Sequence, residues 1–319
     1  MKRMAVLTSG GDAPGMNAAI RAVVRVAISR GVEVCGVQRG YIGLMQGDVI
    51  PMGSNSVGGI IEEGGTVLHT ARCSAFRMEA GQAEAAAALQ RAGVDGLVVI
   101  GGNGSQTGTL ALHGRGVHAV GVASTIDNDF AAFDITIGAD TALNTIVEAI
   151  DRIRDTASSH ERTFIVETMG RGCGWLALHA ALATGADIVL VPEAPWELAA
   201  VAARIEARQR AQKTHTIIVI AEGAGSGTSL ARQLTERTGA ETRATVLGHV
   251  QRGGAPTAFD RILASRSAAT ATQALLDGRS GVVAGLQNGR VTLMAIEEAL
   301  AGTRALDTAL FELEGTFGV

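Results

Sequence analysis

The sequence predicts an α/β protein of two Rossmann-like domains, with mostly parallel sheets covered by helices on both faces. Strand-like apolar runs alternate with helical patterns from end to end, which is the rhythm of βαβ units. In addition, 42 of the 319 residues are glycine, about twice the average share of roughly 7%. The glycines gather at turns between strands and helices, which favours an enzyme of this class over a linker-rich protein.

The expected strands are short apolar runs bounded by turn residues, and the expected helices are longer patterns between them. The strands span 4–9, 32–37, 97–100, 119–123, 163–168, 188–192 and 216–221. The helices span 16–30, 79–92, 139–157, 199–212 and 256–276. A fresh series of strands follows the helix that begins at Ala139. We therefore expect that helix to lead into the second domain.

Length and composition set the domain count and exclude several classes. At 319 residues and 47% hydrophobic content, the chain exceeds the usual size of a single core. The expected domains are 1–138 plus about 255–305, and 139–254 plus about 306–319. The net charge is −4 with no basic run, so no nucleic-acid partner is expected. No signal peptide and no apolar run of about 18 residues is present, so no membrane partner is expected either.

The cysteines indicate a reducing compartment. Cys35, Cys73 and Cys173 are scattered without CxxC spacing, which argues against a disulfide framework and against a zinc site. We therefore expect a cytoplasmic protein.

A pair of acidic residues is the most informative local feature. Asp127 and Asp129 follow the apolar run 120–123, so they are expected at the carboxyl end of a strand, where open α/β sheets bind ligands. One carboxylate can act as a base while the other holds a metal. A turn whose Asp and Asn side chains cap backbone amides would use the same residue types. The neighbouring glycine loops favour the functional interpretation.

Two glycine-rich loops, 10–15 and 101–105, follow predicted strands and resemble phosphate cradles. The first turn lacks GxGxxG, which disfavours a Rossmann dehydrogenase, and the Walker pattern fails because neither lysine follows a glycine. Only two of the 27 basic residues, Lys2 and Lys213, are lysines. Phosphoryl chemistry would therefore depend on arginine and backbone amides.

Two further loops carry cationic side chains. Arg171 stands between glycines after the strand 163–168, and Arg243, His249 and Arg252 lie within ten residues of one another. Such a density of donors suits a phosphomonoester. An exposed turn and a solvated loop are the alternatives.

Together these segments resemble the bacterial-type 6-phosphofructokinase family. The matching stretches are 7–21, 125–129, 148–155, 169–171 and 241–254. The resemblance implies transfer of the γ-phosphoryl group of ATP to the 1-hydroxyl of fructose 6-phosphate, which gives fructose 1,6-bisphosphate in glycolysis. It also implies a donor-binding first domain, a sugar-phosphate-binding second domain, and a homotetramer with shared active sites.

The resemblance also assigns roles to single residues. Asp127 matches the catalytic base, Thr125 and Arg171 match groups that stabilise the transferring phosphoryl, and Asp129 acts through Mg²⁺. The donor would be bound by Gly11, Tyr41, Arg72, Arg77, Gly102, Gly104 and Ser105. The sugar phosphate would be bound by Arg162, Met169, Gly170, Glu222, Arg243, His249 and Arg252. In the family, Arg162 and Arg243 come from a neighbouring subunit.

The sequence departs from the family pattern near the donor. Asn103 stands where a metal-facing Asp is usual, so a weak metal ligand is expected there. Gly104 and Ser124 occupy the two positions that distinguish donors; a small Ser leaves room for ATP and brings no cation for pyrophosphate. Cys73 and Gln82 replace an aromatic residue and an Arg on the adenosine side.

The family's effector site is matched only in part. The positions that match or nearly match are Arg21, Arg25, Arg154, Asp187, Lys213 and His215. Ser54, Gly59 and Ala211 replace charged residues, so regulation is expected to be weak or altered. Two alternatives remain open: a pyrophosphate-dependent enzyme, and a catalytically weak phosphate-sensing subunit suggested by Asn103.

Overall fold

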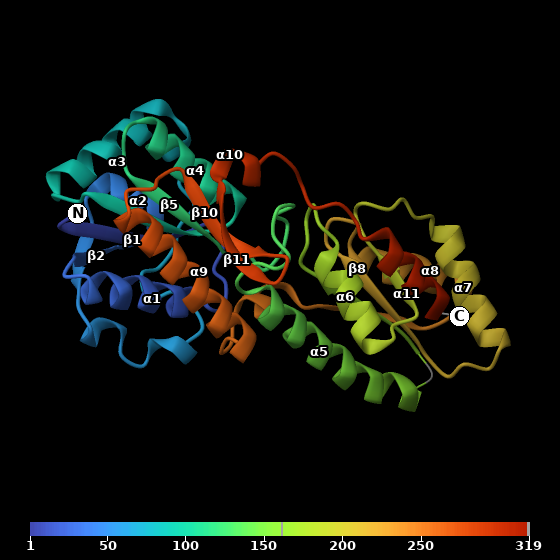
Figure 1. Cartoon of the computed structure of the whole chain (residues 1–319). Helices are drawn as coiled ribbons and strands as arrows, with labels where there is room; N and C mark the ends of the chain where they lie inside the picture. The colour runs from blue at the N-terminus through green and yellow to red at the C-terminus, as the bar shows by residue number, and fades with distance from the viewer. Residues whose placement is uncertain (161, 318–319) are drawn as a thin grey trace. The chain divides into compact units, whose positions relative to one another are not determined.

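The computed structural model describes residues 1–160 and 162–317, and within them the chain folds into two compact units (Figure 1). The first unit holds Met1–Ile126, Phe130–Thr141 and Arg252–Thr303. The second holds Asp127–Asp129, Ala142–Gln251 and the chain from Arg304 onward. Both units contain mostly parallel sheets flanked by helices, which confirms the predicted α/β class. Residues 161 and 318–319, which belong to the expected second domain, lie outside the described residues.

The first unit contains a seven-stranded sheet in the order β11-β10-β5-β4-β1-β2-β3. Its strands are β1 (Arg3–Ser9), β2 (Glu33–Val37), β3 (Val49–Met52), β4 (Gly96–Gly101), β5 (Ala119–Ala123), β10 (Val282–Gln287) and β11 (Arg290–Ala295). The five inner strands are parallel, while β3 and β11 pair antiparallel at the two edges. Ser9 pairs with Gly101, and Gly101 pairs with Ala123. The carboxyl ends of β1, β4 and β5 are therefore level.

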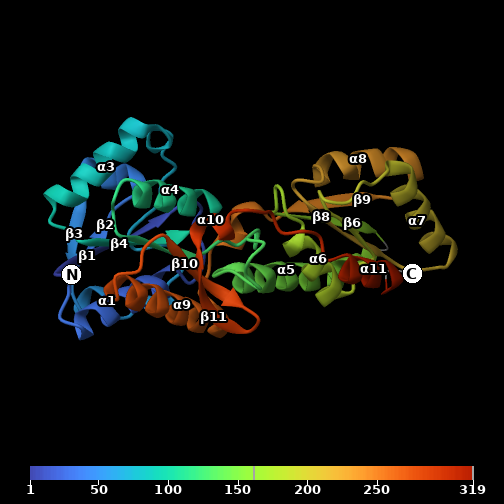
Figure 2. The ribbon, with the colours of Figure 1, turned by 45° about the horizontal axis from the view of Figure 1, so that its top comes forward.

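Helices cover both faces of this sheet. Figure 2 shows α1 and α9 on one face and α3 and α4 on the other. The helices are α1 (Met16–Ser29), α2 (Gly40–Gln46), α3 (Glu79–Arg91), α4 (Asn103–Gly114), α9 (Ala258–Leu276) and the short α10 (Ile296–Ala299). On the α3 and α4 face, Leu7, Val99, Leu89 and Leu112 belong to one buried cluster. Burying this apolar surface holds the strand ends, and the loops that follow them, in fixed positions.

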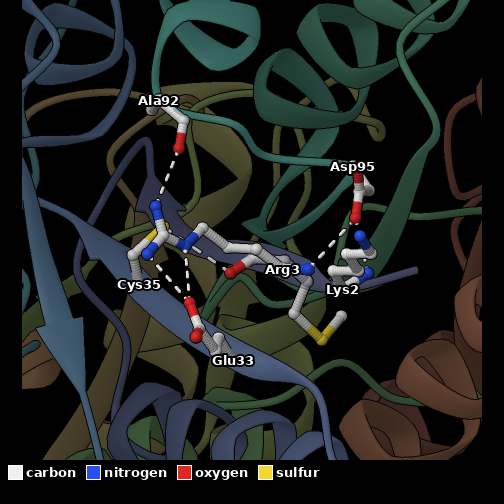
Figure 3. A network of polar contacts seen from close by, with 7 residues as sticks. Lys2, Arg3, Glu33, Cys35, Ala92 and Asp95 are labelled. Carbon is white, nitrogen blue, oxygen red and sulfur yellow. Dashed lines mark hydrogen bonds and ion pairs between the residues drawn. The ribbon is translucent and has the colours of Figure 1, made fainter.

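Polar contacts join the amino-terminal ends of the strands in the same sheet, at the end opposite the glycine loops (Figure 3). The guanidinium of Arg3 donates to Glu33 at 2.8 Å and to the carbonyl of Ala92 at 3.0 Å. Asp95 accepts hydrogen bonds from the backbone N–H groups of Lys2 and Arg3, which lower the pKa of its carboxyl. The start of β1 is thus tied both to β2 and to the segment before β4.

The second unit contains four parallel strands in the order β7-β8-β6-β9. They are β6 (Thr163–Thr168), β7 (Ile188–Leu190), β8 (Thr216–Ala221) and β9 (Thr242–Val246). The helices are α6 (Trp175–Thr184), α7 (Leu198–Arg210), α8 (Gly227–Thr238) and α11 (Thr308–Phe317), with α5 (Ala139–His160) leading in from the first unit. In Figure 2, α7 and α8 lie on one face of the sheet and α6 and α11 on the other.

Several element boundaries differ from expectation by one to three residues, and two of the differences have identifiable reasons. The strand expected over 188–192 ends at Leu190, before Pro192, which has no N–H for a ladder bond. The helix expected from 256 begins at Ala258, because the Thr257 hydroxyl accepts from the N–H of Asp260 and caps the helix. The helix expected over 139–157 continues to His160.

Candidate functional site

Three loops of the first unit meet at the level carboxyl ends of β1, β4 and β5. A Cβ atom added at Gly10 would lie 3.1 Å from the hydroxyl oxygen of Ser105. One added at Gly102 would lie 3.3 Å from Cβ of Thr125. The structure therefore brings the first glycine loop, the start of α4 and Thr125 together, as predicted from the sequence.

The amino terminus of α4 forms one wall of this cluster. The helix begins at Asn103, immediately after Gly102, and runs for 12 residues. A Cβ atom added at Gly104 would meet nothing within 4 Å, so the space beside this residue of the first turn is open. Unpaired N–H groups and the positive end of the helix dipole favour an anion at such a position. The first turn of α4 can therefore hold a phosphate group.

Arg252 lies against the first glycine loop. Its Nη1 donates to the carbonyl oxygen of Asp12 at 3.0 Å, and it would lie 2.4 Å from a Cβ atom at Gly11. A side chain at position 11 would require this guanidinium to shift. Arg252 was predicted to bind the sugar phosphate, and the structure places it beside a predicted donor loop.

Asp12 is a feature of this loop that the sequence interpretation missed. Burial raises the pKa of its carboxyl, although N–H groups of Thr66 and Ala13 and the charge of Arg252 act in the opposite direction. Its Oδ1 is buried without a hydrogen-bond partner among the residues that the structure describes. A half-buried carboxylate thus faces Arg252 next to the phosphate loop.

The other residues predicted to bind the donor differ in how far their side chains are exposed to solvent. Tyr41 is 4% exposed, stacks on Phe76 with ring centroids 3.9 Å apart, and donates to the carbonyl of Ser105 at 2.6 Å. This hydrogen bond therefore holds the first turn of α4 in place. Burial raises the pKa of its hydroxyl, which keeps the group protonated as a donor. Arg72 and Arg77 are exposed on the segment around Phe76.

The two carboxylates Asp127 and Asp129 flank a turn that belongs to the second unit. Between them, Asn128 is fully buried and has a φ of 49°, a left-handed conformation that Asn tolerates better than most residues. Arg304 donates from Nε to the carbonyl of Asn128 at 2.6 Å, and from its backbone N–H to the carbonyl of Asp129 at 3.4 Å. Both acidic side chains are half-buried. Arg304 was not predicted, because nothing in the local sequence relates it to this turn.

The loops after β6 and β8 bring together three predicted sugar-site residues and Arg171, which was predicted to stabilise the transferring phosphoryl. Glu222 donates from its N–H to the carbonyl of Thr168 at 2.8 Å, and the N–H of Gly223 donates to the carbonyl of Gly170 at 3.2 Å. Met169 donates from its N–H to the buried side chain of Gln251 at 3.1 Å. These contacts hold Met169, Gly170 and Glu222 at one end of the sheet, and Arg171 follows Gly170 in the same loop. Arg171, Glu222 and His249 are exposed.

Arg162 and Arg243 lie at the other end of this sheet. Arg162 precedes β6, and Arg243 pairs with Phe164 near its start. The carboxylate of Glu241 binds both guanidinium groups, at 2.8 Å and 2.6 Å, and the pKa of Glu241 is lowered, chiefly by Arg243. At about 3.3 Å per residue, the length of β6 separates these cations from Gly170 by roughly 20 Å. They cannot act on a ligand at Gly170 of the same chain.

The predicted effector residues fall partly into a charged cluster of the second unit. Asp187 forms an ion pair with Arg208 at 2.6 Å and accepts from the N–H of Ile217 at 2.7 Å. Arg154 donates to the carbonyls of Thr184 and Gly185. Burial, followed by the charge of Arg154, lowers the pKa of His215. Asp187 is therefore paired with Arg208 within the chain.

The other predicted effector residues are Arg21, Arg25 and Lys213. Arg21 and Arg25 are on α1 of the first unit, where Arg25 donates to the carbonyl of Ser54 at 3.2 Å. Lys213 is exposed after α7.

The donor chemistry of the site fits magnesium. No group of three or more His, Cys, Asp or Glu side chains suited to a metal exists in the described part of the chain. Mg²⁺ is usually held by one or two carboxylates together with substrate phosphates, so Asp129 supplies a suitable protein oxygen. The amide oxygen of Asn103 is a weaker, uncharged donor.

Among residues 1–160 and 162–317, no helix is long and apolar enough to cross a membrane.

Comparisons with known proteins agree on one family. The phosphofructokinase family matches residues 3–275. An ATP-dependent 6-phosphofructokinase of Halalkalibacterium halodurans is 53% identical over 313 residues, which cover 98% of each chain. One of Brevibacillus brevis is 52% identical over 319 residues, covering 100% of each chain.

Solved structures give the same result for the fold. Phosphofructokinase from Saccharomyces cerevisiae matches with a TM-score of 0.88 and 37% identity over 100% of this chain. The chain spans 48% of that yeast chain's length. A pyrophosphate-dependent phosphofructokinase from Marinobacter aquaeolei matches with a TM-score of 0.86 at 18% identity over 97% of this chain, which shows a shared fold.

Proposed function

The chain belongs to the phosphofructokinase family, and we propose that it is an ATP-dependent 6-phosphofructokinase of glycolysis. It transfers the γ-phosphoryl group of ATP to the 1-hydroxyl of fructose 6-phosphate and releases ADP and fructose 1,6-bisphosphate. The observation that carries this proposal is the full-length similarity, at 53% and 52% identity, to two bacterial enzymes with that name. The cluster of phosphate-binding loops in the first unit supports it.

Asp127 acts as the general base in this proposal. Its carboxylate accepts the proton of the 1-hydroxyl while the oxygen attacks the γ-phosphorus and the bond to ADP breaks. Phosphoryl transfer requires little covalent chemistry from the protein, so positioning and charge stabilisation supply most of the catalysis. The buried turn at Asn128 and the bond from Arg304 support that positioning.

The transferring group is stabilised by fixed donors. Thr125 and Arg171 serve the γ-phosphoryl, and Gly11 and the first turn of α4 serve the donor phosphates through their N–H groups. Asp129 would hold Mg²⁺, with Asn103 as a weak additional partner. When bound, the metal neutralises phosphate charge and orients the donor.

The sugar phosphate is bound by residues from two subunits. Met169, Gly170, Glu222, His249 and Arg252 come from one chain. Arg162 and Arg243 come from a neighbour, because the length of β6 prevents them from serving the same chain's Gly170. We therefore propose a homotetramer with shared active sites, with ATP and fructose 6-phosphate as its small-molecule partners.

ATP is favoured over pyrophosphate as donor. Ser124 is 1% exposed and donates to the carbonyl of Ile137 at 3.3 Å, so this position offers no cation for pyrophosphate. Gly104 leaves open space beside the first turn of α4. Arg72 and Arg77 are exposed and able to meet the nucleotide. Steady-state kinetics of the purified chain with each donor tests this choice. A higher kcat/KM with pyrophosphate would contradict it.

Regulation and location complete the proposal. The ion pair between Asp187 and Arg208, together with Ser54, Gly59 and Ala211, supports weak or altered control by nucleotide diphosphate or phosphoenolpyruvate. We place the enzyme in the cytoplasm, because its three described cysteines are free thiols. Asn103 supports a second candidate, a catalytically weak phosphate-sensing subunit. Negligible turnover of fructose 6-phosphate by a folded, ATP-binding chain would favour that candidate.

A further inference from the structure

We propose that Arg304 is a positioning residue, which holds the turn bearing Asp127 and Asp129 in its reactive conformation. The inference rests on the proposed function in that Asp127 is taken as the base. Arg304 does not need to touch either substrate for this role. It acts through the backbone of the residue between the two carboxylates.

The contact is short and joins distant parts of the chain. Nε of Arg304 donates to the carbonyl of Asn128 at 2.6 Å, across 176 positions of sequence. A charged donor makes a stronger hydrogen bond than a neutral one. Because Asn128 is fully buried, its carbonyl has no access to water as a substitute partner. Loss of the guanidinium therefore removes a charged donor from a buried acceptor.

The conformation of the turn explains why it needs such support. Asn128 has a φ of 49°, a left-handed conformation that Asn tolerates better than most residues but that is still less favourable than the right-handed region, so contacts with its surroundings help to hold it. Relaxation of Asn128 would rotate the peptide groups on either side and move both carboxylates. A misplacement of about 1 Å can cost roughly 100-fold in rate. The side chain of Arg304 thus controls the positions of Asp127 and Asp129 together.

Backbone bonds hold the same segment independently of this side chain. The N–H of Arg304 donates to the carbonyl of Asp129, and Thr303 forms an antiparallel bridge with Phe130. Replacement of the side chain leaves these bonds possible. The expected defect is therefore a loosened turn within a folded protein.

The test compares Arg304→Ala with Arg304→Lys, and uses Arg237→Ala as the matched control. Arg237 is an exposed arginine in the last turn of α8. We expect Arg304→Ala to lower kcat by about 10–100-fold, the range for losing an outer-shell partner. KM for fructose 6-phosphate and for ATP should stay within a few-fold of wild type. Arg304→Lys should recover only part of kcat, because an ammonium group lacks the planar fork of arginine.

Chemical rescue separates positioning from general destabilisation. Methylguanidinium at non-denaturing concentration should restore part of kcat in Arg304→Ala. It should restore no activity in Asp127→Ala and should leave the kcat of Arg237→Ala unchanged. A kcat within two-fold of wild type in Arg304→Ala would overturn the proposal. So would a loss of kcat that methylguanidinium does not restore, because Arg304 would then be a purely structural residue.

Amide hydrogen exchange gives a readout that does not depend on activity. Peptides covering 126–130 should exchange faster in Arg304→Ala than in wild type, and those covering β1 should not change. Unchanged exchange at 126–130 would defeat the inference about Arg304. If the wild-type chain fails to phosphorylate fructose 6-phosphate, the proposed function fails, while the exchange result still decides whether Arg304 holds the turn.

Discussion

Asp127 and Asp129 are chemically identical side chains for which we propose different roles. Their separation by one buried residue in a left-handed conformation distinguishes them more than any difference in composition does. A base needs a lone pair directed at the substrate proton, whereas a metal ligand needs an oxygen directed at the cation. Small changes of backbone angle at Asn128 would exchange or abolish these roles.

Replacement of Asp127 by Ala should lower kcat by roughly 10²–10⁴, the range for losing a positioned general base. Binding of fructose 6-phosphate, measured by calorimetry, should persist because other residues hold its phosphate. Asp151→Ala, on an exposed part of α5, serves as the control and should match wild type. A variant of Asp127 that stays within a few-fold of wild type would remove this residue from the role of base.

Asn103 is the departure from the family pattern nearest to the chemistry. Its amide oxygen carries no negative charge to attract Mg²⁺. The enzyme should therefore require a higher Mg²⁺ concentration than an enzyme with Asp at this position. Asn103→Asp should lower the Mg²⁺ concentration that gives half-maximal activity, or raise kcat. Asp129→Asn should be far more damaging than any change at position 103. If Asn103→Asp leaves the Mg²⁺ concentration for half-maximal activity unchanged or raises it, this loop binds phosphate and not the metal.

At the scale of elements, a buried carboxyl on α11 makes the stability of the fold depend on pH. Glu314 is 4% exposed, and its Oε1 has no hydrogen-bond partner among the described residues. Burial raises the pKa of Glu314 from 4.5 to about 7; Asp187 acts in the same direction and Arg204 opposes it. The folded chain therefore binds this proton more tightly than the unfolded chain. The stabilising contribution is complete below pH 4.5 and is lost as the pH rises through about 7.

Glu314→Gln should consequently raise the thermal unfolding midpoint at pH 8, because a neutral amide avoids the buried charge. The advantage should shrink toward pH 5, where the wild-type carboxyl is protonated. Glu312→Gln is the control, since Glu312 is exposed on the same helix. An equal effect of Glu314→Gln at pH 5 and pH 8 would show that the carboxyl does not titrate in this range.

Elements defined by local pattern were predictable, and contacts between distant segments were not. The apolar runs of β1, β5, β6 and β8 lie in the structure where the sequence places them. The hairpin of β10 and β11 was missed, although Asn288 and Gly289, both at positive φ, form the Asn-Gly turn typical of hairpins. That signal was available in the sequence.

The site shows the same division between local and distant information. The glycine loops and the carboxylates follow apolar strands, so their place at strand ends could be predicted. The pairing of Asp187 with Arg208, and that of Asn128 with Arg304, joins segments that only the folded chain brings together. No periodicity or motif encodes such pairs, because each partner lies outside the other's pattern.

At the scale of the whole molecule, the register of the second sheet constrains assembly. Arg162 and Arg243 share Glu241 at the amino-terminal end of β6, while Met169 and Gly170 follow its carboxyl end. Arg162 and Arg243 can therefore reach a phosphate at Gly170 only from another chain. An active site built in this way would require an oligomer, and a monomer would lack two of its cations.

Subunit mixing tests this requirement directly. Asp127→Ala and Arg243→Ala chains, each nearly inactive alone, should regain activity when unfolded and refolded together. A hybrid pair contains one site with Asp127 from one chain and Arg243 from the other, so random pairing gives roughly a quarter of wild-type sites. The control mixes Asp127→Ala with Arg171→Ala; both residues are assigned to the same chain's site, so no intact site can form. Recovery in that control, or full activity of a monomer in sedimentation, would contradict the shared site. Recovery in the first mixture alone would establish that Arg243 acts across a subunit boundary.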